Sequence, residues 1–176
     1  MTYFSSRDIV AIAMCAGIWA VLNNTLAPIV WRMTHVPFTC DLLGFVSLIL
    51  VAWWTRKLGA ASLTGILVAV LTLMFRPDAT HMIGFTVASI IFDFLTRTVS
   101  YRNSFDKPLP STLSLISFST ICAGIAGLII GSFFLDIKIA LEVFAGMHAG
   151  GGFIGGIVGL VLVRALTVRV GTPSRL

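Results

Sequence analysis

The residues with the clearest chemical potential are polar side chains set within or beside long apolar runs. Asn23, Asp41, His81, Glu142 and His148 occupy such positions. A polar group inside a membrane is costly, so it is by default a candidate for function. Carboxylates and imidazoles can exchange protons or pair with a charged ligand, and an amide can hydrogen-bond to one.

Aromatic side chains accompany these polar groups along the sequence. Phe45 and Phe85 lie close to them, and Trp19, Trp31 and Phe144 are near by. An apolar, aromatic pocket with a few convergent polar groups is typical of small-molecule sites. The sequence therefore predicts one substrate-binding site, formed by Asn23, Asp41, Phe45, His81, Phe85, Glu142 and His148.

Other kinds of chemistry have weaker support. Asp41 could instead stabilise the N-terminus of a helix through the macrodipole. The three histidines with Asp41 and Glu142 would suit a transition metal, but no pair has the i,i+3 or i,i+4 spacing of a helical metal site. No nucleophile and base stand at a spacing that indicates catalysis. We therefore expect no metal site, no catalytic residue and no enzyme.

The elements that position these residues are expected to be transmembrane helices. The chain is 57% hydrophobic and only 11% charged, whereas an ordinary soluble domain carries about 25% charged residues. Apolar runs approach the roughly 20 residues that cross a bilayer as a helix. The prediction is an all-α, polytopic membrane protein: one transmembrane domain over residues 1–176, folded as a six-helix bundle. The expected helices are 9–30, 38–54, 60–75, 81–95, 113–135 and 139–166.

The basic residues predict the orientation of this bundle. Six spans would put both termini on one side, together with most of the Lys and Arg residues, and cytoplasmic loops are rich in both. We therefore expect a multi-pass protein of the cell (plasma) membrane with both termini in the cytoplasm, and no nucleic-acid partner. The expected cytoplasmic residues are Arg7, Arg56, Lys57, Arg97, Arg102, Lys107, Arg164, Arg169 and Arg175; the expected outer ones are Arg32, Arg76 and Lys138.

Small residues at four-residue spacing mark helix faces that pack closely in lipid. The first helix carries Ala13 with Gly17 and Ala16 with Ala20, a face that fits a partner subunit as well as internal packing. The last helix carries two glycine rows: Gly151, Gly155 and Gly159, and Gly152 and Gly156. Internal packing is the favoured interpretation of these rows, and an oligomer seam is the alternative. The run 150–152 also predicts a pliable or unwound stretch, since each glycine costs about 1 kcal/mol against alanine.

Nearly the whole chain resembles the substrate-binding (S) component of an energy-coupling factor (ECF) vitamin transporter. The similarity rests on the alanine-rich first helix (AIAMCAGIWA, 11–20), a long first outer loop and a glycine-rich final helix. It also rests on the segment RKLGAASLTGILVAVLTLMFRPDA (56–79), nearest the hydroxymethylpyrimidine/thiamine branch. The chain does not begin with the N-terminal histidine motif of the cobalt/nickel branch.

The resemblance implies a mode of action. Such components bind a vitamin near the outer face under a lid, here 27–38, and dock on a transmembrane coupling protein driven by a pair of ATP-binding-cassette ATPases. The cargo would be a vitamin-like small molecule, with no covalently bound cofactor and with ATP bound only by partners. The docking face would comprise Ala13, Ala16, Gly17 and Ala20.

The sequence leaves the cargo and two rival functions open. A cationic pyrimidine or thiazolium would use Asp41 and Glu142 as counter-charges and the aromatics as cation–π walls, and this is the favoured alternative. A carboxylate would instead use Arg32 or Arg76. The rival functions are a stand-alone permease or channel acting as an oligomer, and an intramembrane enzyme that uses the histidines and Glu142.

Overall fold

The structure is a computed structural model that describes residues 3–101, 105, 110–134 and 139–171. Within these residues the chain is all-helical, which confirms the predicted class. Five of the helices, all except α3, are long and apolar enough to cross a membrane. The helices are α1 (Ser6–Thr34), α2 (Phe38–Thr55), α3 (Ala60–Phe75), α4 (Met82–Val99), α6 (Pro110–Phe133) and α7 (Leu141–Val170).

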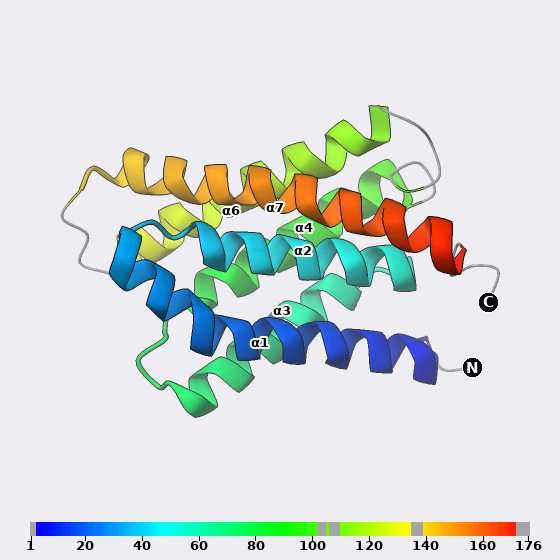
Figure 1. The fold of residues 1–176 in the computed structure, drawn as a ribbon, viewed down its shortest axis with the longest axis horizontal. Helices are drawn as coiled ribbons and strands as arrows, with labels where there is room; N and C mark the ends of the chain where they lie inside the picture. The colour runs from blue at the N-terminus through cyan, green and yellow to red at the C-terminus, as the bar shows by residue number, and fades with distance from the viewer. Residues whose placement is uncertain (1–2, 102–104, 106–109, 135–138, 172–176) are drawn as a thin grey trace.

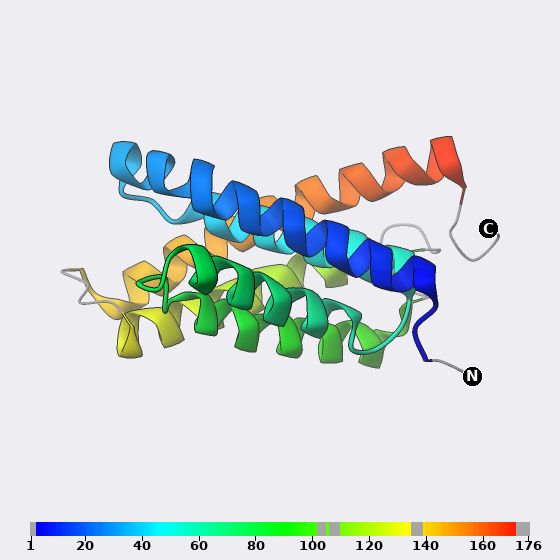
Figure 2. The same cartoon turned by 90° about the horizontal axis from the view of Figure 1, so that it is seen from below.

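The six helices pack side by side as a closed ring (Figures 1 and 2). Its order is α2, α1, α3, α4, α6, α7 and back to α2, and α2 also contacts α3 across the ring. Successive helices reverse direction, so α1 begins and α7 ends at the same end of the bundle (Figure 1). We call this the terminal end, and the opposite end, where α1 meets α2, the cavity end.

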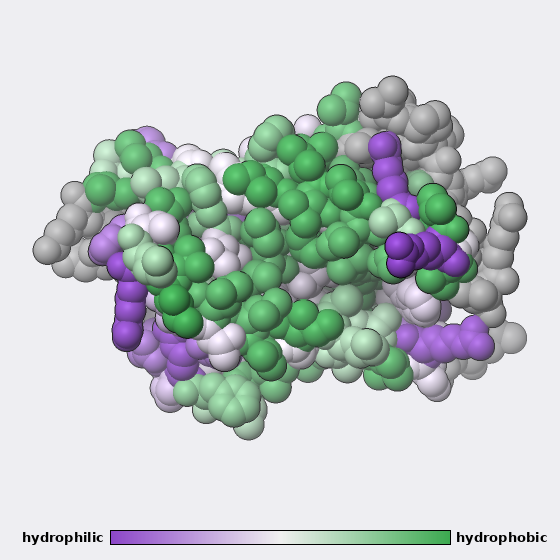
Figure 3. Space-filling model, viewed as in Figure 1, coloured by the Kyte–Doolittle hydropathy of each residue, from purple (hydrophilic) through white to green (hydrophobic). Residues whose placement is uncertain are grey.

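Charged groups are separated between these two ends. Figure 3 shows a broad hydrophobic band across the middle of one face, with hydrophilic residues to either side. Arg32 and Arg76 lie at the cavity end, in the last turn of α1 and just after α3. The described basic residues near the terminal end are Arg7, Arg56, Lys57, Arg97, Arg164 and Arg169. Arg102, Lys107, Lys138 and Arg175 fall outside the described residues.

Helix α1 is longer than predicted, and this corrects the expected outer lid. It begins with a capping box, in which the side chains of Ser5 and Asp8 each accept from the other's backbone N–H. At the other end it continues through Pro28 to Thr34 and stops at His35, which is left-handed (φ 57°). Residues 27–34 are therefore helical, and only 35–37 connect α1 to α2. The expectation of a long first outer loop was wrong because α1 bends and continues (Figure 1), as helices do at an internal proline.

The glycines of α7 are internal packing surfaces, as the favoured interpretation predicted. A Cβ on Gly151 would lie 2.8 Å from the Cβ of Asp41, and one on Gly155 would lie 3.0 Å from the Cα of Leu42, both on α2. Gly152 and Gly156 face α6 in the same way. The helix runs unbroken from Leu141 to Val170, so an unwound stretch is ruled out. Close approach to two neighbours is what these glycines provide.

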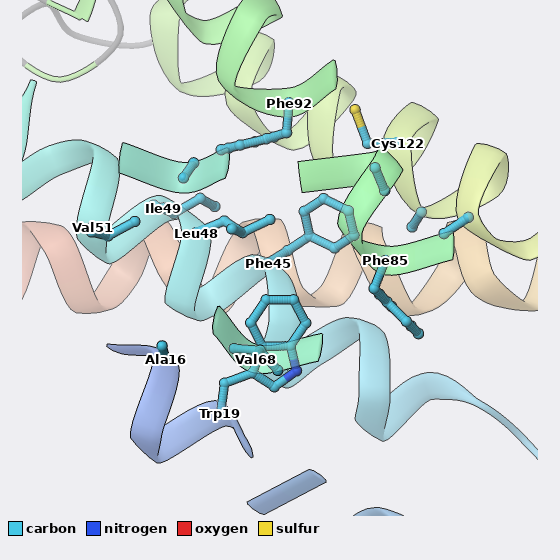
Figure 4. Close-up of a cluster of buried hydrophobic side chains, with 14 of the residues drawn as sticks. Ala16, Trp19, Phe45, Leu48, Ile49, Val51, Val68, Phe85, Phe92 and Cys122 are labelled. Atoms are coloured by element: carbon cyan, nitrogen blue, oxygen red, sulfur yellow. The ribbon is translucent and has the colours of Figure 1, made fainter. Parts of the chain in front are cut away.

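An aromatic and aliphatic core fills the centre of the ring (Figure 4). Trp19, Phe45 and Phe85 come from α1, α2 and α4, and each is almost fully buried. The Trp19 and Phe85 rings meet edge to face at 6.2 Å. Ala16 and Ala20 belong to the same core, with exposed fractions of 1% and 3%.

The predicted docking face is therefore divided. Ala16 and Ala20 face into the bundle and cannot meet a partner subunit, which corrects that part of the expectation. Ala13 is exposed, and a Cβ on Gly17 would meet no atom within 4 Å. Only Ala13 and Gly17 of the four remain available on the outside of α1.

Paired polar groups close the terminal end. The Nζ of Lys57 lies 2.8 Å from Oδ2 of Asp8 and donates to the Tyr3 carbonyl. The buried Asp93 on α4 accepts from the backbone N–H of Gly59 (2.8 Å) and of Ser62 (3.0 Å). The Ser62 hydroxyl and the Tyr101 hydroxyl also donate to it. Asp93 thus caps α3 from the neighbouring helix, because Gly59 at the N-cap has no side chain to do so.

Candidate functional site

A cavity of about 280 Å³ lies at the cavity end, enclosed by residues from every helix except α3 and by the links that follow α1 and α3. This volume is near the lower limit of the roughly 300–1,000 Å³ that small-molecule sites occupy. Its lining residues are Asn23, Ala27, Pro28, Trp31, Arg32, Val36, Pro37, Thr39, Cys40, Arg76, His81, Phe85, Ile130, Phe144 and His148.

The deepest polar feature is a buried Asp41–His148 pair. The Nδ1 of His148 lies 3.0 Å from Oδ1 and 2.9 Å from Oδ2 of Asp41, and the side chains are 3% and 0% exposed, respectively. Gly151, one turn along α7 from His148, lets α2 approach closely enough for this pair. Asp41 therefore orients the imidazole of His148 instead of capping α2, and a neutral ring that donates from Nδ1 presents Nε2 as an acceptor.

The other nitrogen of His148 is buried without a partner. His148 lines the cavity, and its Nε2 is buried with no hydrogen bond from any described residue. The rings of Phe144 and Phe85 flank the imidazole, with centroids at 4.7 and 5.9 Å. The aromatic neighbours hold the ring in place but cannot satisfy Nε2.

Asn23 repeats this arrangement on α1. Its side chain is 1% exposed, and its Nδ2 makes a weak contact of 3.4 Å with the sulfur of Met82. Its Oδ1 is buried and has no partner among the described residues. Since Asn23 also lines the cavity, the site contains two buried polar atoms whose hydrogen bonds are unmade.

The rim of the cavity carries positive charge. Arg32 is exposed at the end of α1, and Arg76 is half-buried just after α3. The Nη2 of Arg76 lies 3.7 Å from Oδ2 of Asp78, a carboxylate that is 79% exposed. His81 stands next to α4, and burial, together with the charge of Arg76, lowers its pKa to about 4. His81 is therefore neutral at physiological pH, and the two arginines are the fixed charges.

The structure brings four of the seven predicted site residues to the cavity wall: Asn23, His81, Phe85 and His148. Asp41 lies behind His148 and does not line the cavity. Phe45 belongs to the core, where its ring meets Phe92 edge to face at 5.8 Å. Glu142 is exposed in the first turn of α7, away from the lining residues. The Glu142 side chain is exposed and does not line the cavity, so the counter-charge expected from it is absent from the site.

Several lining residues were not predicted. Cys40 on α2 and Ile130 on α6 line the cavity, but nothing in the sequence distinguishes them from other apolar positions. The Asp41–His148 pair joins residues 107 positions apart, and no local spacing indicates it. Arg32 and Arg76 also line the cavity. They could have been predicted as site residues, but the sequence analysis considered them only for a carboxylate ligand.

The arrangement is suited to binding, and the described residues offer little for metal chemistry. No three His, Cys, Asp or Glu side chains in the described part of the chain gather closely enough to hold a metal ion. The cavity is lined by two residues that each carry an unpartnered buried polar atom, by aromatic side chains, and by two arginines. Comparison with protein-family models, with curated proteins and with solved structures found no match to this chain.

Proposed function

We propose that this chain is a membrane-embedded binding protein for a small organic solute. The observation that supports it is that two residues lining one cavity, His148 and Asn23, each hold an unpartnered buried atom, Nε2 and Oδ1 respectively. Leaving a buried polar atom unsatisfied costs about 1–3 kcal/mol. A bound solute that hydrogen-bonds to both atoms would recover this cost.

We further propose that the protein acts as the substrate-binding subunit of an ATP-driven importer of the ECF type. The sequence resemblance supports this, and the cavity lies opposite the end rich in basic residues, which the positive-inside rule assigns to the cytoplasm. The solute would be a vitamin or a cofactor precursor. A transmembrane coupling protein and a pair of ATPases would supply the energy.

The oligomeric permease is less well supported by the structure. Its expected seam was the glycine face of α7, and those glycines contact α2 and α6 inside the bundle. The intramembrane enzyme is also less well supported, because Glu142 lies away from the cavity that contains His81 and His148.

Native mass spectrometry of the gently purified protein tests solute binding. The wild type should retain a small molecule, and Asn23→Leu should lose it because the replacement removes the polar atom at the cavity base. Phe94→Leu, on an exposed part of α4, is the matched control and should retain the molecule. A wild-type protein that is empty, and that no vitamin stabilises thermally, would contradict the proposal.

A second experiment tests the importer assignment separately. Gly17→Trp places a large side chain where α1 has open space, so folding and solute binding should be intact. If the coupling protein docks along Ala13 and Gly17, ATP-dependent uptake should be abolished. Val70→Trp on the exposed side of α3 is the control and should transport normally. Full uptake by Gly17→Trp would remove this face of α1 from any docking surface.

A further inference from the structure

The cavity has a distinct charge character, which follows from its lining residues. Arg32 and Arg76 line it, and no Asp or Glu is found among the described lining residues. A guanidinium group remains charged at any physiological pH. Among the described lining residues, the permanent charges are therefore both positive.

The described carboxylates near the cavity do not cancel the positive charge of its two arginines. Asp41 is held by His148 and does not line the cavity. Asp78 is 79% exposed and lies 3.7 Å from Arg76, and an exposed pair of this kind is weakly bound and screened by salt. Arg76 can therefore turn to a ligand at little cost. Glu142 is exposed elsewhere on α7.

The base of the cavity selects a different part of a ligand. A neutral His148 ring that donates from Nδ1 to Asp41 offers Nε2 as an acceptor, and Asn23 Oδ1 is another acceptor. Both would receive hydrogen bonds from N–H or O–H groups of the ligand. Phe85 and Phe144, which flank His148, provide flat apolar surface for a ring.

From this layout we infer that the solute is a small planar ring compound with an acidic group. The acidic group meets Arg32 and Arg76 at the mouth, and ring N–H or O–H donors meet His148 and Asn23 at the base. Arginine pairs well with a carboxylate because its two N–H groups match the two oxygens. The inference rests on the proposed binding function, and it replaces the cationic pyrimidine or thiazolium favoured by the sequence.

A charged-reagent experiment tests this without knowledge of the solute. Val36 lines the cavity and is half-buried, so Val36→Cys, in a protein whose three cysteines are replaced by alanine, places a thiol there. The thiol is treated with anionic sulfonatoethyl or cationic trimethylammonioethyl methanethiosulfonate. Each rate is divided by that of the same reagent with a free small thiol.

The corrected rate should be about tenfold higher for the anionic reagent, because a cleft lined by one sign of charge concentrates counter-ions. The ratio should fall towards one in Arg32→Gln and Arg76→Gln. Arg97→Gln, which removes the same charge from the terminal end, should leave the ratio unchanged.

The contrary outcomes separate the two proposals. Equal rates, or a faster cationic reagent, would overturn the acidic substrate class and leave solute binding standing. Failure of both reagents to react would show a cavity closed to solutes and would overturn both. A ratio insensitive to both arginine variants would also overturn the inference, since these residues are its source.

Discussion

The terminal end and the cavity end of this bundle use buried polar groups in opposite ways. At the terminal end, Asp93 accepts hydrogen bonds from Gly59, Ser62 and Tyr101, and Asp8 pairs with Lys57. At the cavity end, His148 and Asn23 each leave one buried atom unmatched. The helices between are continuous, so the two ends share one scaffold and differ in how completely their polar atoms are paired.

We relate the paired groups of the terminal end to stability and the unpaired groups of the cavity end to ligand binding. A fully paired buried group contributes to stability and leaves nothing for a ligand, whereas an unpaired one costs stability and is open to a ligand. Natural proteins place such local costs at functional sites. We therefore expect substitutions at the terminal end to change unfolding, and substitutions at the cavity end to change binding.

The largest effect should come from Asp93→Ala. It removes the cap of α3 and leaves the backbone N–H groups of Gly59 and Ser62 without their acceptor. Hydrogen bonds to a charged group are each worth about 1.5–3 kcal/mol, so the loss should be at least about 3 kcal/mol. Thermal unfolding in detergent should show a clearly lowered midpoint, with solute binding retained below it. Wild-type stability would mean that this network is not needed.

A smaller effect is expected for Lys57→Met at the same end. Its ammonium group contacts Asp8 and the Tyr3 carbonyl, but the Lys57 side chain is 36% exposed. An ion pair whose cation is partly exposed is screened and contributes about 1 kcal/mol, and Asp8 would keep its hydrogen bond from the Ser5 N–H. The unfolding midpoint should fall by much less than in Asp93→Ala. If the two variants lost equal stability, burial would not explain why the Asp93 network matters.

At the cavity end, Asn23→Leu should not destabilise the protein as the terminal-end substitutions do. Because the change removes an unsatisfied buried acceptor and keeps the branched shape of the side chain, stability should be unchanged or rise by up to about 1 kcal/mol. Solute binding should weaken at least about tenfold, the cost of one lost hydrogen bond. Thr72→Val is the matched control, since its hydroxyl is also buried and unpartnered but does not line the cavity. Equal loss of binding in both variants would contradict a direct role for Asn23.

Much of the fold could be predicted from the sequence. Apolar runs separated by short polar links located the helices, and the start of α2 and both ends of α3 agree with the structure. The ends of α1 were harder to predict: the expected helix covered 9–30, but α1 runs from Ser6 to Thr34. Small-residue spacing indicated that α1 and α7 each have a face for close packing, yet it could not show that Ala16 and Ala20 face the core.

The site was predicted less completely, for a physical reason. Polar residues in apolar runs identified Asn23, His81 and His148 as candidates, since lipid penalises them wherever they point. Charge alone misled for Glu142, which is exposed, because the direction of a side chain depends on the rotation of its helix. The pairing of Asp41 with His148 depends on the α2–α7 crossing, which no local pattern encodes.

The smallest effect concerns pH and His81. Burial lowers the pKa of His81 to about 4, below its ordinary value near 6.5. Between these values the unfolded chain binds a proton that the folded protein does not, so stability is greatest above about pH 6.5 and decreases as pH falls towards 4. The unfolding midpoint should therefore drop less between pH 7 and pH 5 in His81→Gln than in the wild type. An equal drop in both proteins would mean that His81 does not contribute to the pH dependence of stability.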